Sequence, residues 1–275
     1  GADPVWEELD LRNFLTKQIA TFNQQVGTSS LDFAALYAEW LECRSLSEGQ
    51  QRLLPKRIEQ WPCQPRIMPV VFCHEDDELA LRATLDSLTA QSYVASRILL
   101  LGPAGSTSPA VAGVEYQVLR DDGFGQINTL LANDAQADWI LLLQAGDRLH
   151  PHALVIMAER MALRTDMLCL YSDEGTHDGR GPSMPIFKPD FNLDLMRAYP
   201  YVGRTLAFER QRFMTLGGFD SAHGELAPHD LLWRLVEEAG PQTIEHIAEI
   251  QIESSQSFAA WLSLPEVIEN NAGMV

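Results

Sequence analysis

The first sixty residues carry apolar positions at helical spacing. The first apolar face is formed by Trp6, Leu9, Phe14, Leu15, Ile19 and Phe22. Amphipathic patterns of the same period follow in residues 31–41 and 45–58, after a breaker at residues 26–30. A proline-rich joint at residues 62–65 ends the third pattern. The spacing therefore predicts three helices that precede the rest of the fold.

From residue 66 the pattern changes to short strand-like runs, most of them apolar, that alternate with amphipathic segments. The runs are residues 70–73, 97–101, 114–119 and 139–143, and the segments are residues 78–91, 126–136 and 151–163. The runs have the length of buried strands and the segments the length of helices. The alternation predicts an α/β fold with a mostly parallel sheet flanked by helices. Ligands bind beyond the carboxyl ends of such strands, so we expect a site in the loops after residues 73, 101 and 143.

The same pattern divides the chain into three parts. We expect residues 1–62 to form a helical N-terminal extension and residues 63–255 to form the α/β domain. Residues 256–275 are expected to be a C-terminal helix or tail. Apolar residues at helical spacing in that last part predict a helix that packs on the domain.

The chain is strongly acidic, with 38 acidic and 20 basic residues and a formal net charge of −18. The basic residues are scattered singly, so the surface repels phosphate backbones and anionic lipid headgroups. We therefore expect no nucleic-acid partner. A diphosphate ligand would need a metal ion, a helix N-terminus or a single Arg or Lys to offset its charge.

Cysteine usage and the lengths of apolar runs indicate the compartment. Cys43, Cys63, Cys73 and Cys169 have no metal-ligand spacing, which favours reduced, packed side chains. The first residues lack the basic, apolar and small-residue succession of a signal peptide. The longest apolar run, residues 139–143, is too short to span a bilayer. These features predict a cytoplasmic protein without a transmembrane segment.

Five motifs occur in order between about residue 36 and about residue 250. They are Tyr37 with Trp40, Asp-Trp-Ile at 138–140 with the loop at 147–154, Tyr-Ser-Asp-Glu at 171–174, Phe-Lys-Pro-Asp-Phe-Asn-Leu-Asp-Leu at 187–195, and Gly-Gly-Phe at 217–219. This series resembles one branch of the family-2 glycosyltransferases, which carries similar motifs in the same order. The resemblance implies a GT-A fold that binds a nucleotide-sugar and transfers its sugar, with inversion, to a glycan acceptor.

Inverting transfer makes three chemical demands. A base must take the proton from the acceptor hydroxyl. The leaving diphosphate needs positive charge, usually Mg²⁺ or Mn²⁺ held by carboxylates. The nucleobase and ribose need a pocket with polar contacts.

The nucleotide pocket that the resemblance implies is only partly matched. The family's Pro-x-Tyr-Asn after the first strand is replaced by a stretch that contains His74 and Glu75. These two residues are candidates to contact the base, with a solvated loop as the alternative. After the second strand, Gly105 and Ser106 match the end of the family's Asp-Asp-Gly-Ser, but both carboxylates are missing.

The metal-binding motif is also altered. The family's Asp-x-Asp-Asp is replaced by Gln-Ala-Gly-Asp, which leaves Gln144 as a candidate nucleotide contact and Asp147 as the one carboxylate. Asp147 is a candidate metal ligand or the cap of a helix that begins near Pro151. Asp173, in the Tyr-Ser-Asp-Glu motif, is a second candidate ligand, with a plain strand end as the alternative. We expect Mn²⁺ or Mg²⁺ only if the site has been rearranged.

The position of the base holds a residue that cannot accept a proton. Pro228 stands where the family has a carboxylate, two residues before an Asp-Leu that starts a helix. Asp230 is kept and is either catalytic or a helix N-cap. Glu225 and His229 are the candidates to replace the base. The family's Tyr-His-Trp-Arg near the diphosphate is replaced by Ile-Glu-Ser-Ser at residues 252–255.

Losses at the pocket, the metal site, the base and the diphosphate contact predict weak or lost catalysis on a preserved scaffold. Loss of a base alone typically costs about 10²–10⁴ in rate. We expect a pseudoenzyme that binds a nucleotide-sugar, a glycan or a protein partner in a glycan-assembly complex. The alternative is an active inverting glycosyltransferase of polysaccharide or glycan synthesis, with a rearranged site that uses Glu225, His229, Asp147 or Asp173. Acidic side chains around the mouth of the site would favour the active transferase. An apolar or shallow mouth would favour the pseudoenzyme.

Overall fold

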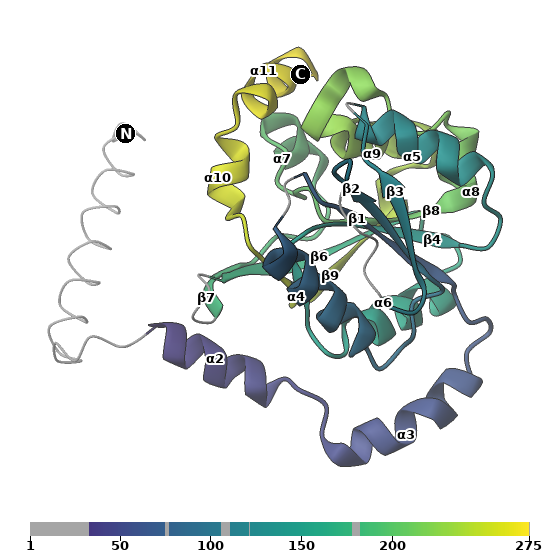
Figure 1. The fold of residues 1–275 in the computed structure, drawn as a ribbon, viewed down its shortest axis with the longest axis vertical. Helices are drawn as coiled ribbons and strands as arrows, with labels where there is room; N and C mark the ends of the chain where they lie inside the picture. The colour runs from purple at the N-terminus through teal and green to yellow at the C-terminus, as the bar shows by residue number, and fades with distance from the viewer. Residues whose placement is uncertain (1–32, 75–76, 106–110, 121, 178–181, 275) are drawn as a thin grey trace, which may run out of the picture.

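The structure is a computed structural model that describes residues 33–74, 77–105, 111–120, 122–177 and 182–274. The first expected helix lies outside this part of the chain, as do Glu75 and Ser106. Within the described ranges, nine strands form one sheet and helices cover both of its faces (Figure 1). None of the described helices is both long and apolar enough to cross a bilayer.

The sheet combines a parallel half with a mixed half. Its strands are β1 (Ile67–Phe72), β2 (Ile98–Gly102), β3 (Val114–Val118), β4 (Trp139–Gln144), β5 (Arg148–Leu149), β6 (Cys169–His177), β7 (Pro182–Ile186), β8 (Ala207–Glu209) and β9 (Ile244–Ser254). The order is β3-β2-β1-β4-β8-β6-β9-β5, with β7 paired to β6. Strands β3, β2, β1 and β4 run parallel, whereas β8 is antiparallel to both of its neighbours. This arrangement confirms the predicted α/β fold.

The helices divide between the two faces of the sheet. They are α2 (Phe33–Cys43), α3 (Glu48–Glu59), α4 (Glu78–Thr89), α5 (Gly123–Ala132), α6 (Ala153–Leu163), α7 (Leu193–Ala198), α8 (Arg210–Thr215), α9 (Ala227–Ala239), α10 (Phe258–Leu262) and α11 (Pro265–Met274), with 3₁₀ turns η1 (Ser221–Leu226) and η2 (Pro241–Thr243). Successive residues of a strand point to opposite faces, so the side chains of β1 pack into two hydrophobic clusters, one on each face of the sheet. Met68 and Val70 pack with α5 and α9, and Ile67 and Val71 pack with α4 and α6. Both faces of the central strands are therefore buried.

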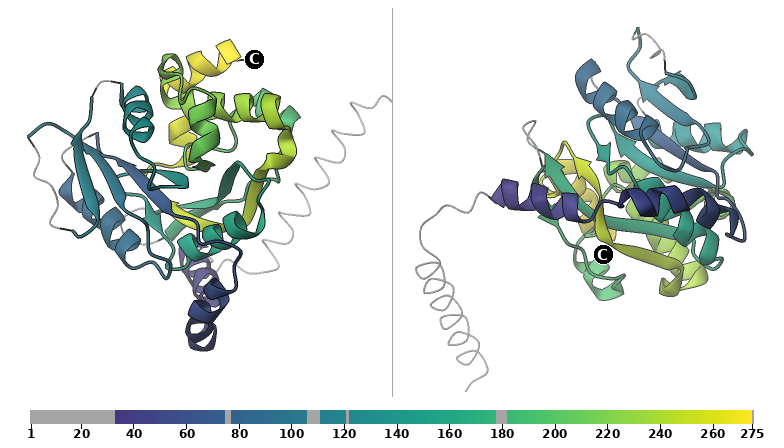
Figure 2. Two further views of the ribbon diagram at one scale, coloured as in Figure 1. Left: turned by 90° about the vertical axis from the view of Figure 1, so that its right-hand side faces the viewer. Right: turned by 90° about the horizontal axis from the view of Figure 1, so that it is seen from below.

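Two aromatic residues attach α2 to the domain. The Tyr37 hydroxyl donates a 2.6 Å hydrogen bond to Oε1 of Glu253 on β9. The Trp40 ring meets the edge of the Phe187 ring at a centroid distance of 6.1 Å. Helices α2 and α3 thus run along one side of the domain, away from α10 and α11 (Figures 1 and 2).

Helix α3 is held by polar contacts at its two ends. Ser47 and Gln50 form a reciprocal capping box at its N-terminus. Near its C-terminus, Arg57 donates two hydrogen bonds, of 2.6 and 3.0 Å, to Glu159 on α6. None of the side chains of α3 is buried, so this helix adds little to the core.

After β9 the chain forms α10 and α11, which pack on η1 at the carboxyl end of the sheet. The predicted C-terminal packing helix corresponds to α10, where Trp261 is buried against Leu226 and Val267. The Asn270 amide donates a 2.9 Å hydrogen bond to the carbonyl of His223 on η1. The last part of the described chain therefore builds one side of the region beyond the strand ends.

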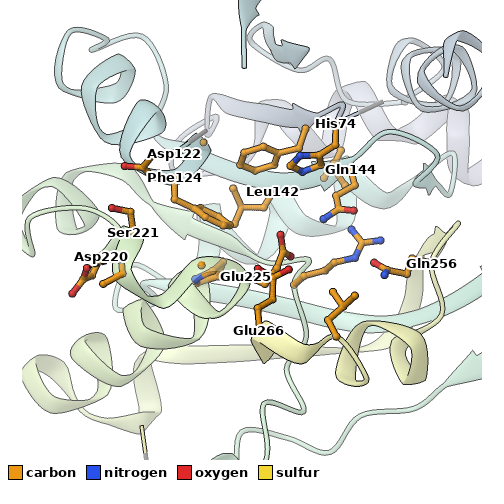
Figure 3. Close-up of a pocket in the computed structure, with 18 residues that line it drawn as sticks. His74, Asp122, Phe124, Leu142, Gln144, Asp220, Ser221, Glu225, Gln256 and Glu266 are labelled. Atoms are coloured by element: carbon orange, nitrogen blue, oxygen red, sulfur yellow. Dashed lines mark hydrogen bonds between the residues drawn. The ribbon is translucent and has the colours of Figure 1, made fainter. Parts of the chain in front are cut away.

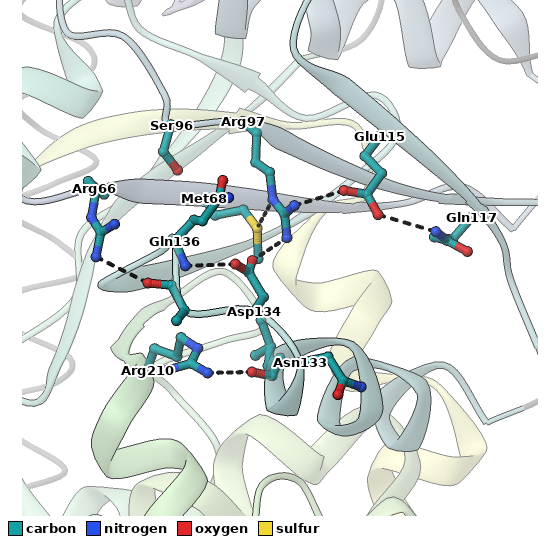
Figure 4. A network of polar contacts seen from close by, with 12 residues as sticks. Arg66, Met68, Ser96, Arg97, Glu115, Gln117, Asn133, Asp134, Gln136 and Arg210 are labelled. Atoms are coloured by element: carbon teal, nitrogen blue, oxygen red, sulfur yellow. Dashed lines mark hydrogen bonds and ion pairs between the residues drawn. The ribbon is translucent and has the colours of Figure 1, made fainter.

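Ion pairs organise the opposite, amino end of the sheet (Figure 4). Arg97, just before β2, pairs with Glu115 on β3 at 2.9 Å and with Asp134 after α5. Arg66, just before β1, pairs with Asp138 at 2.7 Å. These pairs tie together the segments that lead into the parallel strands.

Candidate functional site

A cavity of about 1010 Å³ lies at the carboxyl ends of β1 and β4 (Figure 3). Its lining comes from these strand ends, from the start of α5, from η1 and α9, and from the segment around α10 and α11. The lining residues are Phe72, His74, Asp122, Gly123, Phe124, Leu142, Leu143, Gln144, Arg204, Asp220, Ser221, Ala222, Gly224, Glu225, Pro228, Gln256, Leu264 and Glu266. This is the edge at which open α/β sheets bind ligands.

One wall of the cavity is aromatic. The rings of Phe72 and His74 are nearly parallel, with an interplanar angle of 5° and centroids 5.9 Å apart. Phe124, in the first turn of α5, lies 5.3 Å from Phe72 at 57°. Helix α5 approaches β1 closely at Gly123, where an added Cβ would lie 3.0 Å from the Phe72 ring. The glycine therefore lets these rings form a continuous surface.

The facing wall is acidic. Asp220 caps η1, Glu225 lies in η1 and Glu266 in α11, and all three lie across the cavity from Phe124 and His74 (Figure 3). Burial raises the pKa of Glu225 above its ordinary value, and the charge of Glu266 raises it further. Glu225 consequently holds its proton to a higher pH than an exposed glutamate does.

Asp147 is enclosed by protein groups. Its two carboxylate oxygens each lie 2.7 Å from a guanidinium nitrogen of Arg204. The Ser254 hydroxyl and the backbone amide of Gln144 donate two further hydrogen bonds to it, at 3.0 and 2.8 Å. The Asp147 side chain is 0% exposed and that of Arg204 is 9% exposed. The expectation that Asp147 caps a helix is wrong, because α6 begins after His152 and has no side-chain cap.

Asp173 is likewise committed to the scaffold. Its Oδ1 accepts hydrogen bonds from the Lys188 backbone amide (2.8 Å), and it lies 2.9 Å from His246 Nε2. The Lys188 ammonium pairs with Glu174 at 3.0 Å and donates to the carbonyl of Val202 at 2.7 Å. The Tyr-Ser-Asp-Glu and Phe-Lys-Pro-Asp motifs therefore bind each other.

The described residues contain no cluster of three or more His, Cys, Asp and Glu side chains that could hold a metal ion. Asp147 and Asp173, the two candidate ligands, are engaged as described above and are not among the cavity-lining residues. The described residues therefore do not fit a site for Mn²⁺ or Mg²⁺.

The three candidate bases occupy different surroundings. Glu225 lines the cavity, but His229 and Asp230 are not among its described lining residues. His229 is 3% exposed, and burial lowers its pKa to about 4. Asp230 pairs with Arg234 at 2.6 Å, and Arg234 also donates to the carbonyl of Gly218. The N-cap assignment of Asp230 is wrong, because α9 begins three residues earlier, at Ala227.

The candidate nucleotide contacts are only partly brought together. His74 and Gln144 both line the cavity. Gly105, with φ of +93°, is not among the lining residues, and Glu75 and Ser106 lie outside the described residues.

Several lining residues carry no signal in the sequence. Arg204 follows a glycine between motifs, Phe124 lies in an ordinary helix start, and Gln256 and Glu266 lie beyond the last motif. Their positions depend on how distant segments pack.

No protein-family model matches the chain. The O-antigen biosynthesis protein RfbC of Myxococcus xanthus is 28% identical over 282 residues, which covers 94% of this chain and 21% of that protein. The uncharacterized protein y4gI of Sinorhizobium fredii is 26% identical over 237 residues, covering 82% of this chain and 26% of that protein. The chain thus spans about a fifth to a quarter of the length of these relatives.

Solved structures share the fold at low identity. The S. aureus TarS fragment 1–349 in complex with UDP has a TM-score of 0.54 at 13% identity, covering 76% of this chain and 64% of that chain. Glucosyl-3-phosphoglycerate synthase from Mycobacterium tuberculosis, in complex with Mn²⁺, UDP and glucosyl-3-phosphoglycerate, has a TM-score of 0.53 at 14% identity. It covers 83% of this chain and 84% of its own. These likenesses confirm the predicted GT-A-like fold.

Proposed function

We propose that this chain is a glycosyltransferase-type domain of glycan or polysaccharide synthesis. In this proposal it has lost metal-dependent sugar transfer and serves to bind a nucleotide-sugar, a glycan or a protein partner. The resemblance in motifs supports the lineage. The 28% identical relative is named as an O-antigen biosynthesis protein, and one structural neighbour is a glucosyl-3-phosphoglycerate synthase in complex with Mn²⁺, UDP and glucosyl-3-phosphoglycerate. As the chain matches about a fifth of that relative, the domain is proposed to work beside other parts of a larger assembly.

The ion pair between Asp147 and Arg204 is the observation that carries this proposal. A divalent ion at Asp147 would have to displace a guanidinium that binds both carboxylate oxygens. Breaking a buried pair by losing one partner typically costs about 3–5 kcal/mol. Gln144, next to it, offers a neutral oxygen where a hard cation needs an anionic one. A metal-dependent mechanism is therefore disfavoured at this site.

Glu225 supports a second candidate function, an active transferase that needs no metal ion. Its carboxylate faces the cavity, and its raised pKa is a property of general bases. The cavity also has a volume of about 1010 Å³ and is partly lined by carboxylates, the arrangement expected of a rearranged active site. In this candidate Glu225 takes the proton from the acceptor hydroxyl.

Nucleotide release from UDP-, GDP- and dTDP-sugars, measured with and without Mn²⁺ and with acceptor oligosaccharides, tests the two candidates. For the pseudoenzyme we expect no release above that of a Glu225→Gln variant. The exposed Glu59→Gln exchange on α3 is the matched control. Release that needs Mn²⁺ contradicts the proposal. Release that resists EDTA and disappears in Glu225→Gln alone establishes the metal-free transferase.

A further inference from the structure

The described part of the cavity carries an excess of negative charge. Asp122, Asp220, Glu225 and Glu266 line it, against the single guanidinium of Arg204. That guanidinium is already paired with Asp147, so little positive charge is left for a ligand. The N-terminus of α5 also faces the cavity, but the Asp122 side chain accepts the Gly125 amide there at 2.8 Å. An anionic diphosphate is therefore repelled at this site unless it brings its own cation.

The aromatic wall provides a surface for an apolar ligand face. Phe124 and His74 present their rings to the cavity (Figure 3). Phe72 also lines it, with its ring nearly parallel to that of His74. Aromatic rings give large, rigid contact areas, and binding pockets commonly combine them with a few polar groups. A sugar ring has an apolar C–H face and hydroxyls at its edge, so it can contact the rings and carboxylates at once.

Hydrogen-bonding groups around the cavity remain available. The side-chain amides of Gln144 and Gln256 and the carboxylate of Glu266 make no hydrogen bond to another described residue. Amides both donate and accept, whereas ionised carboxylates only accept. This set suits a ligand that is rich in hydroxyl groups, since each hydroxyl can donate to a carboxylate and accept from an amide.

We infer that this cavity binds an uncharged oligosaccharide, without a metal ion and in preference to a nucleoside diphosphate. Sugar rings pack on Phe72 and Phe124, and sugar hydroxyls donate to Glu225 and Glu266. A volume of about 1010 Å³ is at the upper end of ligand pockets, which suits more than one sugar ring. The inference rests on the proposed role of the domain in glycan synthesis and names its ligand class.

Titration calorimetry of the whole chain tests this inference. The probes are neutral trisaccharides of glucose, mannose, rhamnose and N-acetylglucosamine, and UDP and GDP with and without Mn²⁺. We expect at least one neutral trisaccharide to bind in EDTA, with an affinity that changes little between low and high salt, because no ligand charge is screened.

A Glu225→Gln/Glu266→Gln double variant gives opposite results for the two ligand classes. Hydrogen bonds to charged groups are the stronger ones, so oligosaccharide affinity should fall roughly tenfold or more. Nucleotide affinity should instead rise, because two repelling charges are removed. Glu59→Gln is the matched control, since Glu59 is exposed on α3.

Phe124→Leu tests the aromatic wall without the charges. Leucine keeps apolar contact with Phe219, which Phe124 touches at 5.0 Å, but removes the ring face. We expect a several-fold loss of oligosaccharide affinity. The melting temperature of the variant should stay within a few degrees of that of the unaltered chain. Phe187→Leu is the control, as Phe187 is 64% exposed and is not among the cavity-lining residues.

The outcomes separate this inference from the proposed function. Oligosaccharide binding that the double variant weakens supports both. Metal-free binding of UDP or GDP by the unaltered chain that is tighter than its binding of every oligosaccharide overturns the inference, as does the absence of detectable binding to any oligosaccharide, and either result leaves the pseudoenzyme proposal standing. Metal-dependent nucleotide binding with sugar release overturns both.

Discussion

Glu174 and Lys188 show what the motif residues do at the scale of single side chains. Their ion pair is almost fully buried, and the backbone amide of Lys188 donates a hydrogen bond to Asp173. His246 extends the set by stacking on the Tyr171 ring at 4.7 Å. The sequence identifies these motifs, but their partners follow from the pairing of β6 with β7 and β9, which residue order alone does not reveal.

His229 predicts a loss of stability in acid. Burial lowers its pKa to about 4, whereas an unfolded histidine titrates near pH 6.5. Between these values the unfolded chain binds more protons, so stability falls as the pH falls from about 6.5 to about 4. The loss from this residue approaches roughly 3 kcal/mol. Urea unfolding at pH 7, 5.5 and 4.5 should show that His229→Leu removes part of this slope; equal slopes would contradict the assignment.

Arg204 and Asp147 predict a non-additive pair of substitutions. Arg204→Met leaves Asp147 charged and fully buried, and should cost about 3–5 kcal/mol of unfolding free energy. Asp147→Asn combined with Arg204→Met removes the unpaired buried charge and should recover most of the lost unfolding free energy. Urea denaturation of the two single variants and the double variant measures the coupling. Strict additivity would show that the pair is not formed.

At the scale of elements, the parallel half of the sheet follows from the sequence and the mixed half does not. Continuous apolar runs predict β1, β2 and β4 because both faces of these strands are buried, whereas the half-buried strand β3 alternates apolar and polar residues. Strand β9 is different: its buried isoleucines, Ile244, Ile247, Ile250 and Ile252, do not follow the two-residue period of a regular strand. Register shifts against β6 account for the spacing from Ile247 to Ile252, since extra residues of β9 lie opposite Ser172 to Glu174. Strands of two or three residues, such as β5 and β8, are too short to produce a pattern.

Tyr37 predicts how firmly α2 is attached to the sheet. Tyr37→Phe removes the 2.6 Å hydrogen bond to Glu253 and leaves that buried carboxylate without this donor. The expected loss of stability is about 1–3 kcal/mol, and it should appear locally as faster hydrogen exchange of the α2 amides. Hydrogen–deuterium exchange measures this directly, with Glu39→Gln on the same helix as the control. Unchanged protection of α2 in Tyr37→Phe would show that the hydrogen bond does not hold it.

At the scale of the whole molecule, the location of the cavity was predictable and its composition was not. The strand ends after residues 73 and 143 do border it, because parallel strands bring their carboxyl ends to one edge. Arg204, Phe124 and Glu266 reach it from three segments that no shared motif connects. The division of the chain at residues 62 and 255 remains a prediction.

The net charge of −18 predicts the behaviour of the molecule towards polyanions. A surface of this sign should be repelled by nucleic acid, because few phosphate contacts are available to release counterions. Electrophoretic mobility shift with a random 30-base-pair duplex at low salt should show no complex at micromolar protein. A complex that disappears with added salt would reveal a basic surface outside the described residues.

The acidic wall has a consequence for synthesis on the ribosome. Every strand of the sheet has been translated once Ser254 emerges, but Glu266 follows later and belongs to a helix that packs on η1. A nascent chain can therefore complete its sheet while the ligand site is still open on one side. The acidic wall is therefore completed only after the sheet, and a large ligand can contact the aromatic surface before α11 packs beside it.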